Sequence, residues 1–300
     1  MKEYLVFDWG GTSLKYALMN ENAEVKEKGS IDAPRKDSTK EHFYELIDSI
    51  RNQFSSIEGI TISSTGVIDS ENGIIQTIGA FPFLDGTNLK EEFKDRYGLT
   101  VSIENDGKCA ALAELWKGNL SNVDDGAVVV IGTNIGTALI LDHKLRRGKR
   151  FLAGEVCAMC VDEHHTYDPD SYIGQHGTPY LCKLIQEKLS LKETINGLQA
   201  FEYINEGNVD ALQALKEYTD SLAMILFNMN IMLDLEKILI GGGISEQPIL
   251  MDSLKKSIQD IKNIHPDITK GVQYPLPNID VCKYHNEANL IGALYHFLYE

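Results

Sequence analysis

Apolar residues follow two different periods along the chain, and together they predict an α/β protein. Short runs rich in β-branched and aromatic residues predict buried strands, and apolar residues three or four positions apart predict amphipathic helices. The expected strands lie at about 3–9, 13–20, 24–31, 59–64, 73–75, 100–104, 127–131, 137–141, 237–240 and 279–284. The expected helices lie at about 38–55, 88–97, 107–117, 179–189, 197–206, 208–233, 247–262 and 286–299, while residues 143–178 are rich in turns. Strands that alternate with helices in this way indicate layered sheets.

Two of the predicted strand pairs are joined by glycine-rich turns. Residues 6–12 read Val-Phe-Asp-Trp-Gly-Gly-Thr, and residues 130–136 read Val-Ile-Gly-Thr-Asn-Ile-Gly. Because glycine lacks a Cβ, such turns let an anion approach several backbone N–H groups. Asp8 cannot bind a phosphate, but it can hold the Mg²⁺ that accompanies a nucleotide. An ordinary tight hairpin is the alternative for either stretch alone, whereas the likeness of the two favours a nucleotide between two duplicated halves.

Composition and charge narrow the classes of protein that fit. The 300 residues carry a formal net charge of −16 and are 43% hydrophobic, enough for a sizeable core. This charge excludes a typical nucleic-acid-binding protein and does not suit an anionic membrane. We expect neither a secretory signal nor a membrane span, and the 5 scattered cysteines fit reduced thiols, so the expected location is cytoplasmic.

Four features occur in a specific order along the chain. They are Asp-x-Gly-Gly-Thr at 8–12, Glu-Asn-Asp at 104–106, the second glycine turn at 132–136 and Gly-Gly-Gly at 241–243. This ordered set resembles the ROK sugar kinases, within the actin-like ATPase and hexokinase superfamily, over essentially the whole chain. The resemblance implies two α/β domains of the ribonuclease H-like type about a central cleft. The smaller domain would span 1–115 and be joined by a closing helix at 286–300, and the larger would span 116–285.

The resemblance also implies a cofactor, a substrate and a role for individual residues. ATP and Mg²⁺ would be the cofactors, with Asp8 contacting the metal through water, and a sugar would be the substrate. The residues implied for the nucleotide are Asp8, Gly10, Gly11, Thr12, Lys15, Gly132, Thr133, Asn134, Gly136, Gly241, Gly242 and Gly243. The residues implied for the sugar are Gly66, Gly79, Asn88, Asn105, Asp106, Glu155 and Tyr180, with Asp106 also the catalytic base.

The chemistry of these residue types is consistent with the implied roles. Phosphoryl transfer needs an acceptor hydroxyl in line with the γ-phosphate and a group that takes its proton. Asp106 stands between a predicted strand and a predicted helix, which suits a base, although a helix N-cap is its alternative role. Lys15 could equally point into solvent. Glu155 has apolar neighbours, which makes full exposure to solvent unfavourable.

The chain departs from the family at a zinc motif. Many ROK proteins hold zinc through a histidine, here Ala158, and three cysteines, which are replaced within 171–178. We therefore expect no structural zinc. Replacement ligands remain a rival interpretation, because Cys157 and Cys160 have Cys-x-x-Cys spacing and histidines lie nearby. Buried structural thiols are the simpler interpretation.

Specificity is expected to depend on the region between Gly79 and Tyr180. Tyr180 stands where the family has a glutamate near the anomeric side of the sugar, and the loop 79–88 is similar to that of zinc-less β-glucoside or N-acetylmannosamine kinases. The expected reaction is phosphorylation of the 6-hydroxyl of a hexose or hexose derivative. A non-catalytic sugar-sensing or regulatory ROK protein is the alternative. The family also implies a homodimer.

Overall fold

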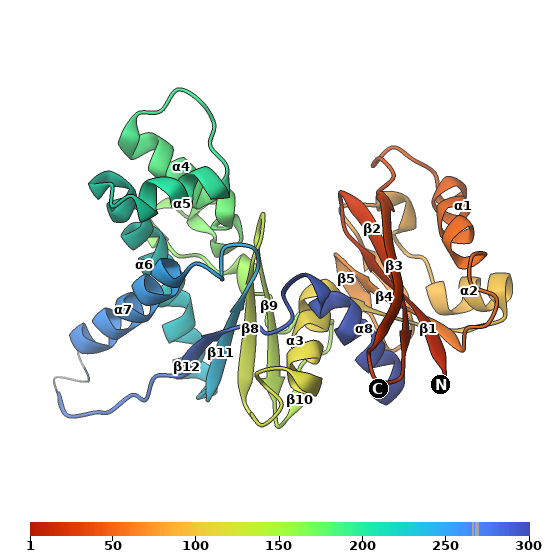
Figure 1. Ribbon diagram of the computed structural model, residues 1–300. Helices are drawn as coiled ribbons and strands as arrows, with labels where there is room; N and C mark the ends of the chain where they lie inside the picture. Colours follow the sequence, from red (N-terminus) through yellow and green to blue (C-terminus); the bar gives the residue numbers. More distant parts are fainter. Residues whose placement is uncertain (266, 268–269) are drawn as a thin grey trace. The chain divides into compact units, whose positions relative to one another are not determined.

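The computed structural model describes residues 1–265, 267 and 270–300, which form two compact units (Figure 1). The first unit comprises residues 1–121, 145–153 and 286–300, and the second comprises 122–144 and 154–285. The sequence predicted that the first domain would end near residue 115 and resume at 286. In the structure the first unit ends at residue 121 and resumes, after the segment 145–153, at 286. The assignment of 145–153 to the first unit was not anticipated, because a short segment without hydrophobic periodicity carries no signal of where it packs.

The first unit contains a five-stranded sheet in the order β3-β2-β1-β4-β7. Strands β1, β2 and β3 pair in antiparallel fashion, whereas β1, β4 and β7 run parallel, so the carboxyl ends of these three strands share one edge. The elements of this unit are β1 (Glu3–Trp9), β2 (Ser13–Asn20), β3 (Val25–Asp32), α1 (Lys40–Arg51), β4 (Gly59–Ser64), β5 (Val67–Asp69), β6 (Ile74–Thr77), α2 (Leu89–Tyr97), β7 (Thr100–Asn105), α3 (Asp106–Lys117) and α8 (Ala288–Tyr299).

Alternation along β1 decides which helices cover which face of this sheet. Leu5, Phe7 and Trp9 pack in one cluster with Phe43 of α1, and the Trp9 and Phe43 ring centroids are 4.8 Å apart. Tyr4, on the opposite face, contacts Phe297 of α8 at 5.3 Å between centroids. Because side chains of a strand alternate between faces, Asp8 lies on the α8 side. Figure 1 shows α1 and α2 on one side of the sheet and α8 on the other.

Helix α8 packs closely against α3, the helix that begins at Asp106. A Cβ on Gly292 of α8 would lie only 1.7 Å from the backbone oxygen of Cys109 in α3, so only glycine allows this approach. Thr61 of β4 also donates a hydrogen bond to the carbonyl of Ala293, at 2.7 Å. Helix α8 therefore holds the beginning of α3, where the candidate base Asp106 lies, against the sheet.

The second unit repeats the strand order of the first. Its sheet runs β10-β9-β8-β11-β12, with β8 and β9 antiparallel and β8, β11 and β12 parallel. This equivalence supports the internal duplication expected from the two glycine turns. The elements are β8 (Gly126–Ile131), β9 (Ile135–Leu141), β10 (Lys144–Leu145), α4 (Thr178–Leu189), α5 (Gly197–Asn205), α6 (Val209–Leu233), β11 (Lys237–Gly241), α7 (Pro248–Ile264) and β12 (Asn278–Val281). Helices α4 to α7 enclose one apolar core with β8 and β11.

A few elements differ from the pattern-based expectation. Helix α1 ends at Arg51 rather than at 55, because the chain turns there to bury Phe54 in the core. Strand β12 ends at Val281, three residues before the expected end, and β10 was not expected. The turn-rich region 143–178 contains β10 and several short 3₁₀ turns, and α4 begins only at its last residue, Thr178. No helix in the described part of the chain is both long and apolar enough to cross a membrane.

Candidate functional site

The first glycine turn places a buried carboxylate beside an exposed tip. Asp8 is only 6% exposed, and its Oδ1 accepts hydrogen bonds from Ser63 Oγ and Asn289 Nδ2, each at 3.1 Å. Its Oδ2 lies 3.7 Å from the Nζ of Lys15, which is half-exposed. The carboxylate is thus held rigidly through one oxygen. The second oxygen is held, among the described residues, only by the longer ion pair with Lys15. Such an oxygen could accept a hydrogen bond from a water molecule on a metal ion.

The tip of this hairpin is built from the backbone. The N–H of Gly10 donates to Ser13 O at 3.1 Å, and Ala33 N donates to Thr12 O at 3.0 Å. Gly11 and Thr12 are exposed. These bonds fix the turn while the glycines keep it free of side chains, which is the requirement for an anion that approaches the main chain.

The second glycine turn has the same form, but it is supported differently. Gly132 N donates to Asn134 O at 3.0 Å, and Thr178 N at the start of α4 donates to Gly132 O at 2.8 Å. A Cβ on Gly177 would lie 2.2 Å from Thr133 O, so the N-terminus of α4 sits directly against this turn. Thr133 and Asn134 are exposed, as expected for a turn that contacts a ligand.

The triple glycine lies next to the second turn, at the same edge of the sheet. Gly241 ends β11 and pairs in register with Val130 of β8. Gly242 has φ +94, and a Cβ there would lie 2.0 Å from Ile131 O. Only glycine fits such a conformation and contact. Gly243 has open space where a Cβ would be. The second unit thus brings Gly132, Gly136 and the triple glycine to one edge of its sheet, and their role in binding a nucleotide stays a prediction.

In the first unit, Asn105 and Asp106 occur where β7 passes into α3. Asn105 is the N-cap: its Oδ1 accepts from Lys108 N at 3.1 Å, and its Nδ2 donates to Gly66 O at 3.0 Å. Asp106 is the first residue of the helix, and its Oδ1 accepts from Gly107 N at 2.8 Å. The capping role considered for Asp106 therefore belongs to Asn105. Asn105 keeps one amide N–H beyond these two bonds for a ligand.

Gly66, Gly79 and Asn88 surround the loop expected to complete the sugar pocket. Gly66 has φ +99, and a Cβ there would lie 2.2 Å from Thr77 O. Asn88 caps α2, since its side chain accepts from Glu91 N at 3.2 Å. Gly79 has open space around it. The loop is held by a 2.7 Å bond from Ile78 N to Asp85 Oδ1 and by Phe81, which is fully buried.

Glu155 and Tyr180 belong to the second unit. Glu155 accepts a hydrogen bond from the Cys157 thiol at 3.8 Å, and burial, followed by the Glu155 carboxylate, raises the pKa of that thiol. Tyr180 stacks on His176 with ring centroids 4.0 Å apart and planes 4° from parallel. Burial raises the pKa of the Tyr180 hydroxyl. One face of Tyr180 is therefore already covered by protein.

Comparisons with known proteins identify the family. The ROK family model matches residues 4–299. The chain belongs to the ROK family. A β-glucoside kinase from Klebsiella pneumoniae is 31% identical over 296 residues, covering 97% of this chain and 94% of that protein. A β-glucoside kinase from Listeria monocytogenes is 29% identical over 297 residues, covering 98% and 97%.

A solved structure agrees with this assignment. The crystal structure of a ROK family protein from Streptococcus pneumoniae in complex with sucrose has a TM-score of 0.85 and 28% sequence identity. The match covers 99% of this chain and 98% of that one. The mixed α/β fold expected from the sequence is thus the actin-like ATPase fold of the ROK proteins.

Some of the residues considered as replacement zinc ligands have other partners in the structure. His176, one of the possible replacement ligands, is 3% exposed, and both of its ring nitrogens are occupied, by Ser221 Oγ at 3.0 Å and Asp170 O at 2.7 Å. Burial lowers the pKa of His176 below its usual value. Cys160 is exposed and donates to Asp162 O. No three His, Cys, Asp or Glu side chains gather as a metal site in the part of the chain that was searched.

Two residues that contact Asp8 were not singled out from the sequence. Ser63 and Asn289 hold Asp8, and Asn289 is 281 positions away from it along the chain. Ser63 could have been found, because β4 runs parallel to β1 and Ser63 is paired in register with Asp8. Asn289 carried no comparable signal, since only the packing of α8 on this sheet brings it close.

Proposed function

We propose that this ROK protein is an ATP-dependent sugar kinase that phosphorylates the 6-hydroxyl of a hexose or hexose derivative. The observation that carries the proposal is the shared carboxyl edge of the neighbouring parallel strands β1, β4 and β7, where Asp8 is the last residue but one of β1, and Gly66 and Asp106 follow β4 and β7. Ligands of α/β sheets bind at such edges. The named β-glucoside kinases, which this chain matches along almost their whole length, support the same reaction class.

In this proposal Asp106 accepts the proton of the acceptor hydroxyl as the phosphoryl group is transferred. A positioned general base of this kind contributes about 10²–10⁴ in rate. Asp8 would hold Mg²⁺ through water, and that ion would neutralise charge on the phosphate oxygens. The backbone of the two glycine turns, together with Lys15, Thr12, Thr133 and Asn134, binds the phosphates. The triple glycine at 241–243 lets the nucleoside lie against the main chain.

The first test measures ADP release against a panel of sugars, with Asp106→Asn beside the wild type. We expect kcat to fall by about 10²–10⁴, with the sugar KM changed by less than about tenfold, because only proton transfer is removed. Asp95→Asn, an exposed carboxylate on α2, is the matched control and should keep wild-type turnover. Full activity in Asp106→Asn would contradict the assigned base. Absence of turnover with every sugar would favour the sensing alternative.

Within this function, we propose β-glucosides as the substrate class to examine first. Three β-glucoside kinases are among the relatives, and the resemblance implies that Tyr180 stands where the family has a glutamate near the anomeric carbon. With one face against His176, Tyr180 presents only its other face and its hydroxyl to a substituent on the sugar. A wide preference for unsubstituted glucose would contradict this assignment. A homodimer is also proposed, and light scattering on the purified chain tests it.

A further inference from the structure

A buried ion network lies beside β7, one residue before the proposed sugar-binding pair. Glu104 is 0% exposed. Its Oε1 accepts from Asn105 N at 2.8 Å, and its Oε2 accepts from Arg147 Nε at 2.6 Å. A single carboxylate thus joins the guanidinium of Arg147 to the peptide that leads into Asp106.

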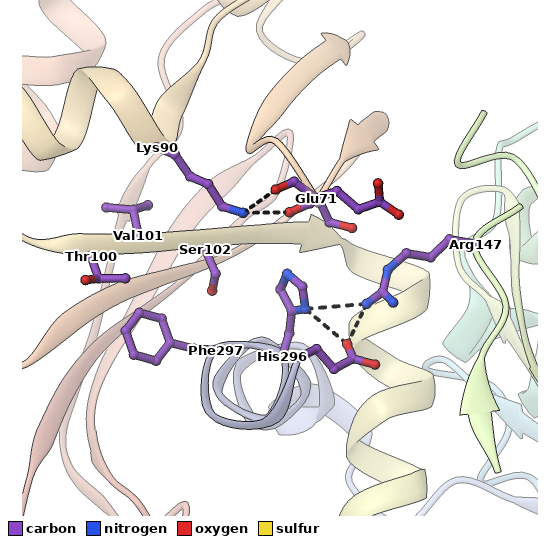
Figure 2. A pocket seen from close by; sticks show the side chains of 10 residues that line it. Glu71, Lys90, Thr100, Val101, Ser102, Arg147, His296 and Phe297 are labelled. Atoms are coloured by element: carbon purple, nitrogen blue, oxygen red, sulfur yellow. Dashed lines mark hydrogen bonds and ion pairs between the residues drawn. The ribbon is translucent and has the colours of Figure 1, made fainter. Parts of the chain in front are cut away.

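Arg147 is itself anchored on its other side. Its Nη2 pairs with the carboxylate of Glu300, and it lies 3.4 Å from Nδ1 of His296, both on or just after α8 (Figure 2). Burial alone would lower the pKa of the Arg147 guanidinium, but the carboxylates of Glu104 and Glu300 outweigh it and raise the pKa. Burial alone would raise the pKa of Glu300, and hydrogen bonds from His296 and Arg147 lower it instead. Arg147 is therefore charged and fixed.

The backbone that carries Arg147 is also constrained. Ala153 N donates to Arg147 O at 3.0 Å, which closes a turn over residues 147–153. Gly148 has φ +74 and Phe151 has φ +60 within that turn. This segment belongs to the first unit, although the residues before and after it belong to the second. It ends two residues before Glu155, the proposed sugar ligand.

We propose that Arg147 is a positioning residue for phosphoryl transfer, which acts through Glu104 to hold the Asn105–Asp106 backbone in its catalytic orientation. This inference rests on the proposed sugar kinase function. The reasoning is geometric: the N–H of Asn105 is bound by a carboxylate whose other oxygen is held by Arg147. Loss of that anchor removes one of the restraints on the Asn105 peptide, beside its bonds to Gly66 and Lys108, so that the peptide and Asp106 can shift together. A displacement of about 1 Å at a reacting group can cost about 100-fold in rate.

A cavity beside the network makes a direct chemical test possible. It has a volume of about 290 Å³ and is lined by Arg147 and His296, with Lys90, Ser102 and Phe297 around them (Figure 2). In Figure 2 the side chain of Arg147 lies at the right of the view, beside His296, and Lys90 lies at the upper left. When the side chain of Arg147 is removed, a free guanidinium ion can enter this space and take its place between Glu104 and Glu300.

The test compares Arg147→Ala with Arg146→Ala, an exposed neighbour on the same segment. We expect Arg147→Ala to lower kcat about 100-fold while the KM for ATP changes by less than about threefold, because the nucleotide residues keep their contacts. Guanidinium chloride, far below the concentration that unfolds the protein, should restore part of kcat in Arg147→Ala only. Arg146→Ala should behave as wild type. The proposal would be overturned if the loss of kcat in Arg147→Ala were explained by the fraction of the variant that is unfolded and if guanidinium had no effect.

A second measurement keeps the inference testable if Arg147→Ala is poorly folded. Glu104→Gln keeps an oxygen for the N–H of Asn105 but removes the buried charge that needs Arg147. The double variant Glu104→Gln/Arg147→Ala should therefore fold better than Arg147→Ala alone and still show the low kcat. Wild-type kcat in a folded double variant would contradict the positioning role.

Amide hydrogen exchange separates this inference from the proposed function. Exchange at Asn105 and Gly107 should be at least tenfold faster in Arg147→Ala than in Arg146→Ala, whatever the protein phosphorylates. Unchanged exchange would overturn the inference even if the enzyme is a sugar kinase. If exchange is faster in Arg147→Ala but the wild-type protein has no kinase activity, the role of Arg147 in holding this backbone would stand and the proposed function would be refuted.

Discussion

The two glycine hairpins share one design but carry different charges. In each hairpin we compare the second pair of opposed residues, counted from the turn. In the first hairpin this pair is Asp8 and Lys15, and in the second it is Val130 and Gly136. Each hairpin then pairs with a parallel strand, β4 or β11, that ends in another glycine turn. Both turns thus have a glycine-rich backbone that could accept an anion, whereas only the first has a carboxylate of the kind that the proposed Mg²⁺ would need.

The largest expected effect comes from removing the charge that distinguishes the first hairpin. Asp8→Asn keeps the hydrogen bonds from Ser63 and Asn289 but loses the negative charge toward Mg²⁺. We expect kcat at saturating ATP to fall by about 100-fold or more, because the ion provides several kcal/mol of charge stabilisation. Val130→Ala changes the matching position of the second hairpin and should cost less than about tenfold. Equal losses in the two variants would show that the hairpins are not specialised.

The second prediction tests how the second hairpin is supported. Gly242→Ala forces an L-residue into φ +94 and brings a Cβ to 2.0 Å from Ile131 O. We expect the free energy of unfolding to fall by at least about 1–3 kcal/mol, from the backbone strain alone. Gly243→Ala, where a Cβ meets open space, should change it by less than about 0.5 kcal/mol. Urea denaturation of both variants measures the difference, and similar midpoints would count against the close contact.

A third prediction concerns how the stability of the protein depends on pH, through a histidine beside the second hairpin. His176 stands next to Gly177, which packs on Thr133, and burial lowers the pKa of His176 in the fold. The unfolded chain therefore binds a proton near pH 6.5 that the folded chain does not, so stability is present above that pH and is lost as the pH falls. One such group contributes at most about 1.4 kcal/mol per pH unit.

His176→Gln removes this titration. Urea midpoints measured between pH 7 and pH 5 should fall more steeply for the wild type than for His176→Gln. Parallel profiles would mean that His176 becomes protonated without cost in the folded protein, in conflict with its buried contacts to Ser221 and Asp170.

The smallest expected effect belongs to Lys15. Its Nζ lies 3.7 Å from Asp8 Oδ2, and its side chain is 44% exposed, so solvent screens the pair. Lys15→Met should change the free energy of unfolding by less than about 1 kcal/mol and the KM for ATP by less than about tenfold. A loss as large as that of Asp8→Asn would show that the proposed contact of Lys15 with the phosphates matters as much as the charge of Asp8.

Sequence pattern predicted the hairpins and strand ends well because their signals are local. Glycine spacing and β-branched runs place Asp8, Gly132 and Gly241 at the ends of strands without knowledge of the rest of the fold. The N-cap fell on Asn105 rather than Asp106, because α3 begins at Asp106, one residue before the expected start at 107. Contacts such as Asn289 with Asp8, or Arg147 with Glu104, depend on packing between distant segments, which periodicity alone does not encode.

The close contact between Gly292 and Cys109 has a consequence for how the protein is made. Unit 2 is complete once residue 285 has left the ribosome, but the first unit still lacks α8 at that moment. Domains fold as units as synthesis proceeds. The strand edge that carries Asp8 and Asp106 therefore gains its supporting helix only after the whole second unit has been synthesised, so the first unit is expected to finish folding after the second.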